Sequence, residues 1–122
     1  MQYEEKEDRK ILKARETQVV EVRSDPDFYL RLSNGATLEF NGTVIHSVGP
    51  RGEGAVRRPL MDLPAEDLST LISARPLSWV VFHSGSQRIV FSNTWFLTLT
   101  PGSGDTWRLD LGDGRVLTYP PQ

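Results

Sequence analysis

Apolar and polar residues alternate through much of the chain, and this alternation predicts β-strands. Residues 28–40 read Phe-Tyr-Leu-Arg-Leu-Ser-Asn-Gly-Ala-Thr-Leu-Glu-Phe, with apolar side chains at alternate positions on each side of an Asn-Gly pair. An Asx-Gly pair between two alternating segments is the strongest short-range signal for a β-hairpin. We therefore expect a hairpin over residues 28–40, with one apolar face and one polar face.

The same frame returns seventy-nine residues later. Residues 107–119 read Trp-Arg-Leu-Asp-Leu-Gly-Asp-Gly-Arg-Val-Leu-Thr-Tyr, again with an aromatic residue at each end and an Asx-Gly turn. A true internal duplication is one explanation. We favour the other, in which strand alternation and turn chemistry alone fix most of the shared positions and both hairpins belong to one continuous sheet.

The remaining pattern predicts a mainly β, α+β fold with about eight or nine strands and one short helix. The helix is expected at 64–74, where Pro64 begins a segment with acidic residues in its first turn. Residues 77–83 are apolar at both alternating sets of positions, which is typical of a strand covered on both faces. An antiparallel sheet of this size must curl into a roll, an open barrel or a two-layer sandwich. Further strands are expected at 17–23, 43–48, 88–91 and 94–100.

The first sixteen residues differ from the rest because charged residues dominate them. Opposite charges recur there three and four positions apart, which is the spacing of neighbouring side chains on a helix. We expect residues 1–16 to form a charged arm or a frayed helix. Residues 17–122 are expected to form a single β-rich domain.

Composition narrows the class of protein. The chain has 122 residues, 38% of them hydrophobic, and no cysteine, which excludes disulfides and thiolate chemistry. No apolar run approaches the roughly 20 residues of a membrane span, and the first residues lack the pattern of a signal peptide. We therefore expect a cytoplasmic protein that does not enter the membrane. A net charge of −2 disfavours nucleic acid as a partner.

The two histidines are the main candidates for chemistry. His46 and His83 each alternate with apolar residues of their expected strands, so both should point where apolar side chains point. No acid lies beside either histidine and no metal-binding or nucleophile motif is present. We predict no catalytic residues, no metal and no cofactor. A small-ligand-binding barrel or roll, with His46 or His83 as its polar anchor, is the alternative function; an enzyme that uses one of them as a base is a weaker one.

The segment from Gly49 to Arg58 breaks the strand pattern with three glycines, a proline and three arginines. Arg51, Arg57 and Arg58 could bind phosphate or carboxylate groups, or an acidic protein surface. Tyr29 has the opposite phase to the apolar residues of its hairpin, so it should lie on the polar face. Tyrosine and arginine are favoured at protein interfaces. We predict that these four residues contact a protein partner; self-association is left open.

Residues 77–121 resemble small uncharacterised bacterial β-rich domains, some of which are similar to immunity proteins of polymorphic toxin systems. The resemblance is carried by Trp-Val-Val-Phe at 79–82, Trp-Phe-Leu-Thr-Leu at 95–99 and Trp-Arg-Leu-Asp-Leu-Gly-Asp-Gly at 107–114. It implies a non-enzymatic protein that binds a cognate toxin and occludes its surface. No site residues are implied by the resemblance, and the mild net charge argues against a nuclease as the target.

Overall fold

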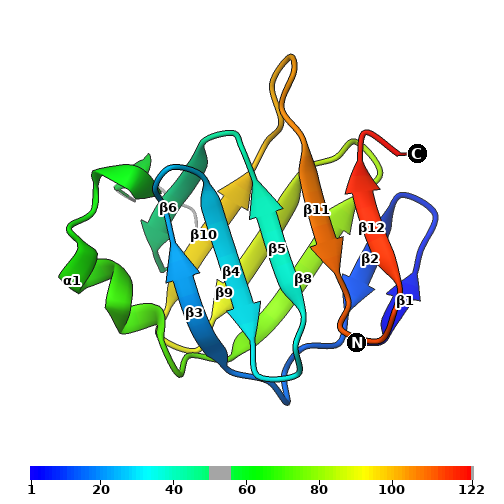
Figure 1. Cartoon of the computed structure of the whole chain (residues 1–122), viewed down its shortest axis with the longest axis horizontal. Helices are drawn as coiled ribbons and strands as arrows, with labels where there is room; N and C mark the ends of the chain where they lie inside the picture. Colours follow the sequence, from blue (N-terminus) through cyan, green and yellow to red (C-terminus); the bar gives the residue numbers. More distant parts are fainter. Residues whose placement is uncertain (50–55, 122) are drawn as a thin grey trace.

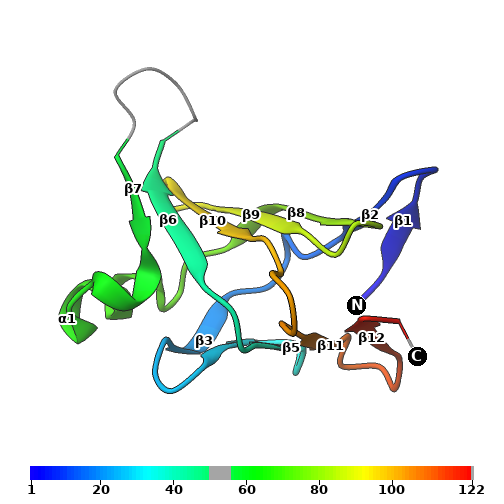
Figure 2. The same cartoon turned by 90° about the horizontal axis from the view of Figure 1, so that it is seen from above.

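The protein consists of two antiparallel β-sheets that face each other, as the computed structural model shows for residues 1–49 and 56–121 (Figures 1 and 2). The mainly β fold is confirmed. Of the three shapes expected, the structure has two layers, and the sheets do not close into a barrel.

The larger sheet has seven strands in the order β1-β2-β8-β9-β10-β6-β7. Its strands are β1 (Tyr3–Glu5), β2 (Arg9–Leu12), β8 (Pro76–Phe82), β9 (Gln87–Phe91), β10 (Trp95–Leu99), β6 (Val44–Val48) and β7 (Arg57–Pro59). The smaller sheet has five strands in the order β12-β11-β5-β4-β3. These are β12 (Val116–Tyr119), β11 (Trp107–Asp110), β5 (Thr37–Phe40), β4 (Phe28–Leu32) and β3 (Val19–Arg23).

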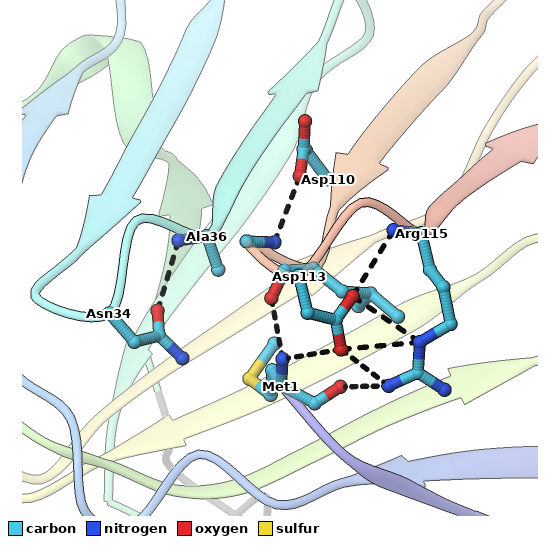
Figure 3. A network of polar contacts seen from close by, with 8 residues as sticks. Met1, Asn34, Ala36, Asp110, Asp113 and Arg115 are labelled. Atoms are coloured by element: carbon cyan, nitrogen blue, oxygen red, sulfur yellow. Dashed lines mark hydrogen bonds and ion pairs between the residues drawn. The ribbon is translucent and has the colours of Figure 1, made fainter.

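Both predicted hairpins form, as β4–β5 and β11–β12, and they lie side by side in the five-stranded sheet. Their registers are identical: Leu30 pairs with Leu38, and Leu109 pairs with Leu117. Their turns are also alike. Asn34 Oδ1 accepts a hydrogen bond from the Ala36 amide (2.9 Å), and Asp113 Oδ1 accepts one from the Arg115 amide (3.1 Å; Figure 3).

The core lies between the sheets and follows from the alternation. Side chains at every second position point inward and are almost fully buried, because each sheet covers the apolar face of the other. The largest are Trp79, Phe40, Phe91, Leu30, Leu32, Leu38, Ile89, Leu97, Leu99 and Leu109. In β10, the buried residues Trp95, Leu97 and Leu99 occupy every second position, as the alternation requires.

Residues 1–16 do not form the frayed helix that their charges suggested. They contain the hairpin β1–β2, which adds two strands to one edge of the larger sheet. Glu5 lies opposite Lys10, and the ion pair between them (3.6 Å) joins two strands instead of two helical turns. The described residues contain twelve strands, more than the eight or nine expected, mainly because of this hairpin and β7.

The helix is also shorter than the predicted 64–74. A 3₁₀ turn (Leu60–Asp62) leads to α1 (Ala65–Leu68), which a second 3₁₀ turn (Ser69–Leu71) follows. The chain then leaves the helix because the Ser73 amide donates to the Val19 carbonyl (2.8 Å) at the edge of β3. No helix of the described residues is long and apolar enough to cross a membrane.

Candidate functional site

The outward-facing surfaces of the two sheets differ in polarity. The outer positions of the five-stranded sheet carry mostly polar and charged side chains, as expected where a sheet meets water, and the exposed valines are Val20 and Val116. The register places them in rows across the strands, and Glu21, Arg23 and Arg31 are linked there by ion pairs of 3.2 Å. The outer residues are Glu21, Arg23, Tyr29, Arg31, Thr37, Glu39, Arg108, Asp110, Val116 and Thr118.

The outer face of the seven-stranded sheet is largely apolar instead. One row runs from Ile11 through Val80, Arg88 and Thr98 to Ile45, and the next runs from Ser78 through Val90 and Phe96 to Ser47. Val80 is buried beneath its neighbours, and the other apolar side chains of these rows are half-buried. We call this surface the apolar face and define it by Ile11, Ile45, Val80, Phe82, Val90 and Phe96.

No described helix or strand covers the apolar face. Figure 2 shows the smaller sheet on one side of the larger sheet and α1 beyond the edge formed by β6 and β7. The contacts of the helical segment agree, since its 3₁₀ turns meet β6 and β3. An antiparallel sheet with an uncovered face usually presents polar side chains there, so the apolar residues make this face the candidate binding surface of the described structure.

Arginines border the apolar face. The Arg9 guanidinium lies 5.4 Å from the centre of the Phe82 ring, and Asp8 holds it in an ion pair (2.9 Å). Arg88 lies within the face, and Arg57 continues one of its rows beyond Ser47. Neither Arg57 nor Arg88 has an ion pair with another described residue. Among the described residues, no acidic residue occupies an outer position of β2, β8, β9, β10, β6 or β7.

The predicted arginine cluster is divided between two faces. Arg57 and Arg58 are both exposed on the edge strand β7, but they are adjacent in a strand and therefore point in opposite directions. Arg57 lies opposite Ser47 on the outer side, whereas Arg58 lies opposite His46 on the inner side. Arg51 lies outside the described residues.

His46 is buried, as expected for a histidine that alternates with valines. Its ring meets Trp95 edge to face with 4.3 Å between ring centres, and its Nε2 has no hydrogen-bond partner among the described residues. Burial, with a smaller contribution from the charge of Arg58, lowers the pKa of His46 below its ordinary value. Each effect disfavours the charged imidazolium. The ring therefore acts as a neutral core side chain.

His83 does not share that environment, and its predicted inward orientation is wrong. β8 ends at Phe82, so the alternation that would have turned His83 inward stops one residue earlier. The side chain is exposed and its Nε2 lies 4.0 Å from a Glu5 carboxylate oxygen. It borders an open groove of about 460 Å³ between the two sheets, beside β12. The two histidines do not form one site.

Tyr29 points outward from β4, as its phase predicted, and the Arg23 guanidinium lies 4.4 Å from its ring centre. Together with Glu39 and Arg108 it lines an open groove of about 630 Å³. This groove belongs to the five-stranded sheet, whereas Arg57 and Arg58 belong to the other sheet. The structure therefore does not bring the predicted partner-binding residues into one surface.

The apolar face was missed because its six residues come from five separate strands. One signal was visible in the sequence: residues 77–83 are apolar at both alternating sets of positions, which suggested covering on both sides. Among the described residues, the smaller sheet packs on the inner side of β8, and no helix or strand packs on its outer side. Within the described residues, no group of three or more His, Asp or Glu side chains is placed to hold a metal ion. Comparisons of the chain with protein-family models, curated proteins and solved structures return no match.

Proposed function

We propose that this protein is a non-enzymatic binding module that docks a protein partner on its apolar face. The observation that carries the proposal is the contrast between the two sheets. One has a charged outer face, and the other has an uncovered apolar face that contains Arg88 and is bordered by Arg57 and Arg9. The partner surface that fits is apolar at its centre and acidic around it.

Two kinds of contact support a protein partner. Burying apolar side chains stabilises a complex by roughly 25 cal/mol for each Å² removed from water, which favours a partner that is itself apolar. Arginines at the border select carboxylates because their planar groups can bind a carboxylate through two hydrogen bonds. A nucleic acid offers phosphate charge but little apolar surface, and the net charge of −2 opposes its approach.

The resemblance to immunity proteins gives this proposal a more specific form. In that form the partner is a bacterial toxin, the protein acts in the cytoplasm, and occlusion of the toxin surface by the apolar face is the mechanism. The absence of cysteines supports a reducing compartment. Occlusion of a toxin surface requires binding alone and no catalytic step.

The experiment uses neighbouring residues of β7 as a matched pair. The tagged full chain is used to capture partners from lysate of its own cells, and the captured protein is identified by mass spectrometry and purified. Its affinity is then measured by titration calorimetry for the wild type, Arg57→Glu and Arg58→Glu. We expect Arg57→Glu to weaken binding at least tenfold, about 1.4 kcal/mol, and Arg58→Glu to have little effect.

A second pair tests the apolar centre. Val90→Glu places a charge on the apolar face, and Thr37→Glu places one on the outer face of the other sheet; both residues are half-buried. Val90→Glu should abolish binding while Thr37→Glu preserves it, with thermal melts confirming that each variant folds. If Thr37→Glu or Arg58→Glu weakens binding and the apolar-face variants do not, the partner binds elsewhere and the proposal is wrong.

A further inference from the structure

β12 is the least protected edge strand of the described structure. Natural sheets protect their edges with charges, prolines or covering segments, because unpaired backbone groups can bind another strand. β1 carries Glu4 and Glu5, and β7 contains two arginines and Pro59. The edge of β3 is covered where Val19 exchanges hydrogen bonds with Ser73 and Ala74 (2.8 and 2.9 Å). β12 reads Val-Leu-Thr-Tyr and has none of these devices.

The hairpin ladder shows which backbone groups of β12 are free. The Leu111 amide donates to the Arg115 carbonyl (2.9 Å) to close the hairpin. Hydrogen-bonded and non-hydrogen-bonded pairs alternate along an antiparallel ladder, so Leu117 and Tyr119 bond toward β11. The amides and carbonyls of Val116 and Thr118 therefore point away from the sheet. Outside the ladder, no described residue hydrogen-bonds them.

The first hairpin shows how such an edge is satisfied. Thr37 and Glu39 occupy in β5 the places that Val116 and Thr118 occupy in β12, because the two hairpins have the same register. The edge of β5 is covered by an antiparallel strand, β11, with Asp110 opposite Thr37 and Arg108 opposite Glu39. The equivalent edge of β12 has the same geometry and lacks the covering strand.

We propose that β12 pairs antiparallel with β12 of a second copy of this chain, which joins two five-stranded sheets into one. Val116 of each copy lies opposite Thr118 of the other, and Leu117 faces Leu117 across the two-fold axis. This register satisfies all four free groups on each copy. Moving the axis toward Val116 would bring Thr118 opposite Gly114 in the turn, and moving it toward Thr118 would bring Val116 opposite Pro120, which has no amide hydrogen.

The side chains of β12 fit this self-pairing. No like charges meet, since the strand itself is uncharged and Arg115 comes opposite Tyr119. The groove beside β12, lined by Phe82, His83, Leu117 and Tyr119 among others, leaves room for the second leucine on the inner side. A contact of two four-residue strands is small, so the dimer is expected to be concentration-dependent.

The first test is sedimentation equilibrium of the full chain between about 10 µM and about 1 mM, which brackets the dissociation constants of weak complexes. We expect the mass to rise from the 13.8 kDa of the chain toward twice that value. Thr118→Pro removes one free amide without touching the β11 ladder, and Val116→Lys adds a charge at the edge; both should stay monomeric. Val20→Lys on β3 is the matched control, because Val20 is 39% exposed and Val116 38%. A wild type that is monomeric throughout overturns the proposal.

The second test fixes the register by disulfide formation, with no background because the chain lacks cysteine. Facing residues of a non-hydrogen-bonded pair have Cα atoms about 4.5 Å apart, within the roughly 4.4–6.8 Å that a disulfide spans. Leu117→Cys should therefore oxidise to a covalent dimer. Two copies of Val116→Cys would lie about 8 Å apart on the diagonal and should not. Cross-linking of Val116→Cys or Val20→Cys in place of Leu117→Cys would contradict the proposed pairing.

Discussion

Thr94 occupies a backbone conformation that glycine holds elsewhere in this protein. Its φ is +72°, and the turn around it repeats the turn at Gly35: in each, the amide of the left-handed residue donates to the carbonyl three positions earlier (3.0 Å). A side-chain oxygen also accepts a hydrogen bond in both turns: the Trp95 amide donates to Asn93 Oδ1, and the Ala36 amide donates to Asn34 Oδ1. A β-branched residue at positive φ is strained.

Replacing Thr94 with glycine should therefore stabilise the protein. The left-handed conformation costs an L-residue about 1–2 kcal/mol, which outweighs the roughly 0.5–1 kcal/mol of chain entropy that glycine loses on folding. We expect a gain of about 0.5–1 kcal/mol, measured by chemical denaturation. Thr94→Ala is the control: it keeps the strain, so it should show no comparable gain.

Asp113 is the most strongly perturbed carboxyl of the described chain. The Arg115 guanidinium, 2.6 Å from Oδ2, is the main cause of a pKa far below the ordinary value, with the Arg115 amide and the Met1 ammonium adding to it (Figure 3). Because the folded-state pKa is lowered, the carboxylate stabilises the fold above the ordinary aspartate pKa near 4. This contribution is lost as the pH falls from there toward the folded-state pKa.

Asp113→Asn tests this charge without removing the turn, since Asn34 makes the same side-chain hydrogen bond in the first hairpin. We expect the variant to be less stable at pH 7 and to lose less stability than the wild type on acidification to about pH 2, below the ordinary aspartate pKa. Urea denaturation at both pH values measures the difference. Asp110→Asn is the matched control, because Asp110 accepts a hydrogen bond from the Gly112 amide but forms no ion pair with an arginine of the described residues. Parallel pH profiles for wild type and Asp113→Asn would contradict the assignment.

At the scale of elements, the turn between β8 and β9 joins the two sheets. Gly85 has φ +98°, its carbonyl accepts a hydrogen bond from Trp107 Nε1 (2.7 Å), and the Tyr119 ring lies directly against it. A Cβ at Gly85 would come within 2.5 Å of that ring, whereas a Cβ at Gly35 (φ +88°) would meet no atom within 4 Å. Substitution of Gly35 therefore measures backbone strain alone, whereas substitution of Gly85 measures the same strain together with a clash against the Tyr119 ring.

We expect Gly35→Ala to cost about 1 kcal/mol, the strain of the left-handed conformation alone. Gly85→Ala should cost roughly 1–3 kcal/mol more, because the Tyr119 ring must move out of contact. Near-ultraviolet circular dichroism should change in Gly85→Ala only, since Trp107 and Tyr119 both meet this turn. Equal destabilisation of the two variants would show that the ring contact contributes nothing.

Elements with strong local signals were predictable, and those that depend on distant contacts were not. The hairpins at 28–40 and 107–119 follow from alternation and turn residues. The β1–β2 hairpin was missed because a dense mixture of opposite charges is compatible with a helix as well as with a hairpin. The pairing of Glu5 with Lys10 appears only when the two strands are aligned. The helix was overextended because the Ser73–Val19 hydrogen bond, fifty-four residues apart in sequence, ends it.

For the whole molecule, the sequence predicted a β fold with polar and apolar strand faces but not which outer face would be apolar. That property depends on which strands become neighbours: Ile11, Val80 and Ile45 share a row only because β2, β8 and β6 belong to one sheet. The same dependence separated Tyr29 from both arginines of β7, whereas Arg57 and Arg58 point apart because they are adjacent in one strand. Single-residue signals such as the burial of His46 were easier, since they require only the phase of one strand.

The neighbouring hairpins of the five-stranded sheet also constrain the order in which the protein can be assembled during synthesis. β5 ends at Phe40, yet the strand that covers its edge begins at Trp107, so most of the chain is translated between two adjacent strands. Contacts so distant in sequence slow folding because a long loop must close before they form. Until residues 107–119 leave the ribosome, the first hairpin has an open edge, and two of the five strands of its own sheet are missing.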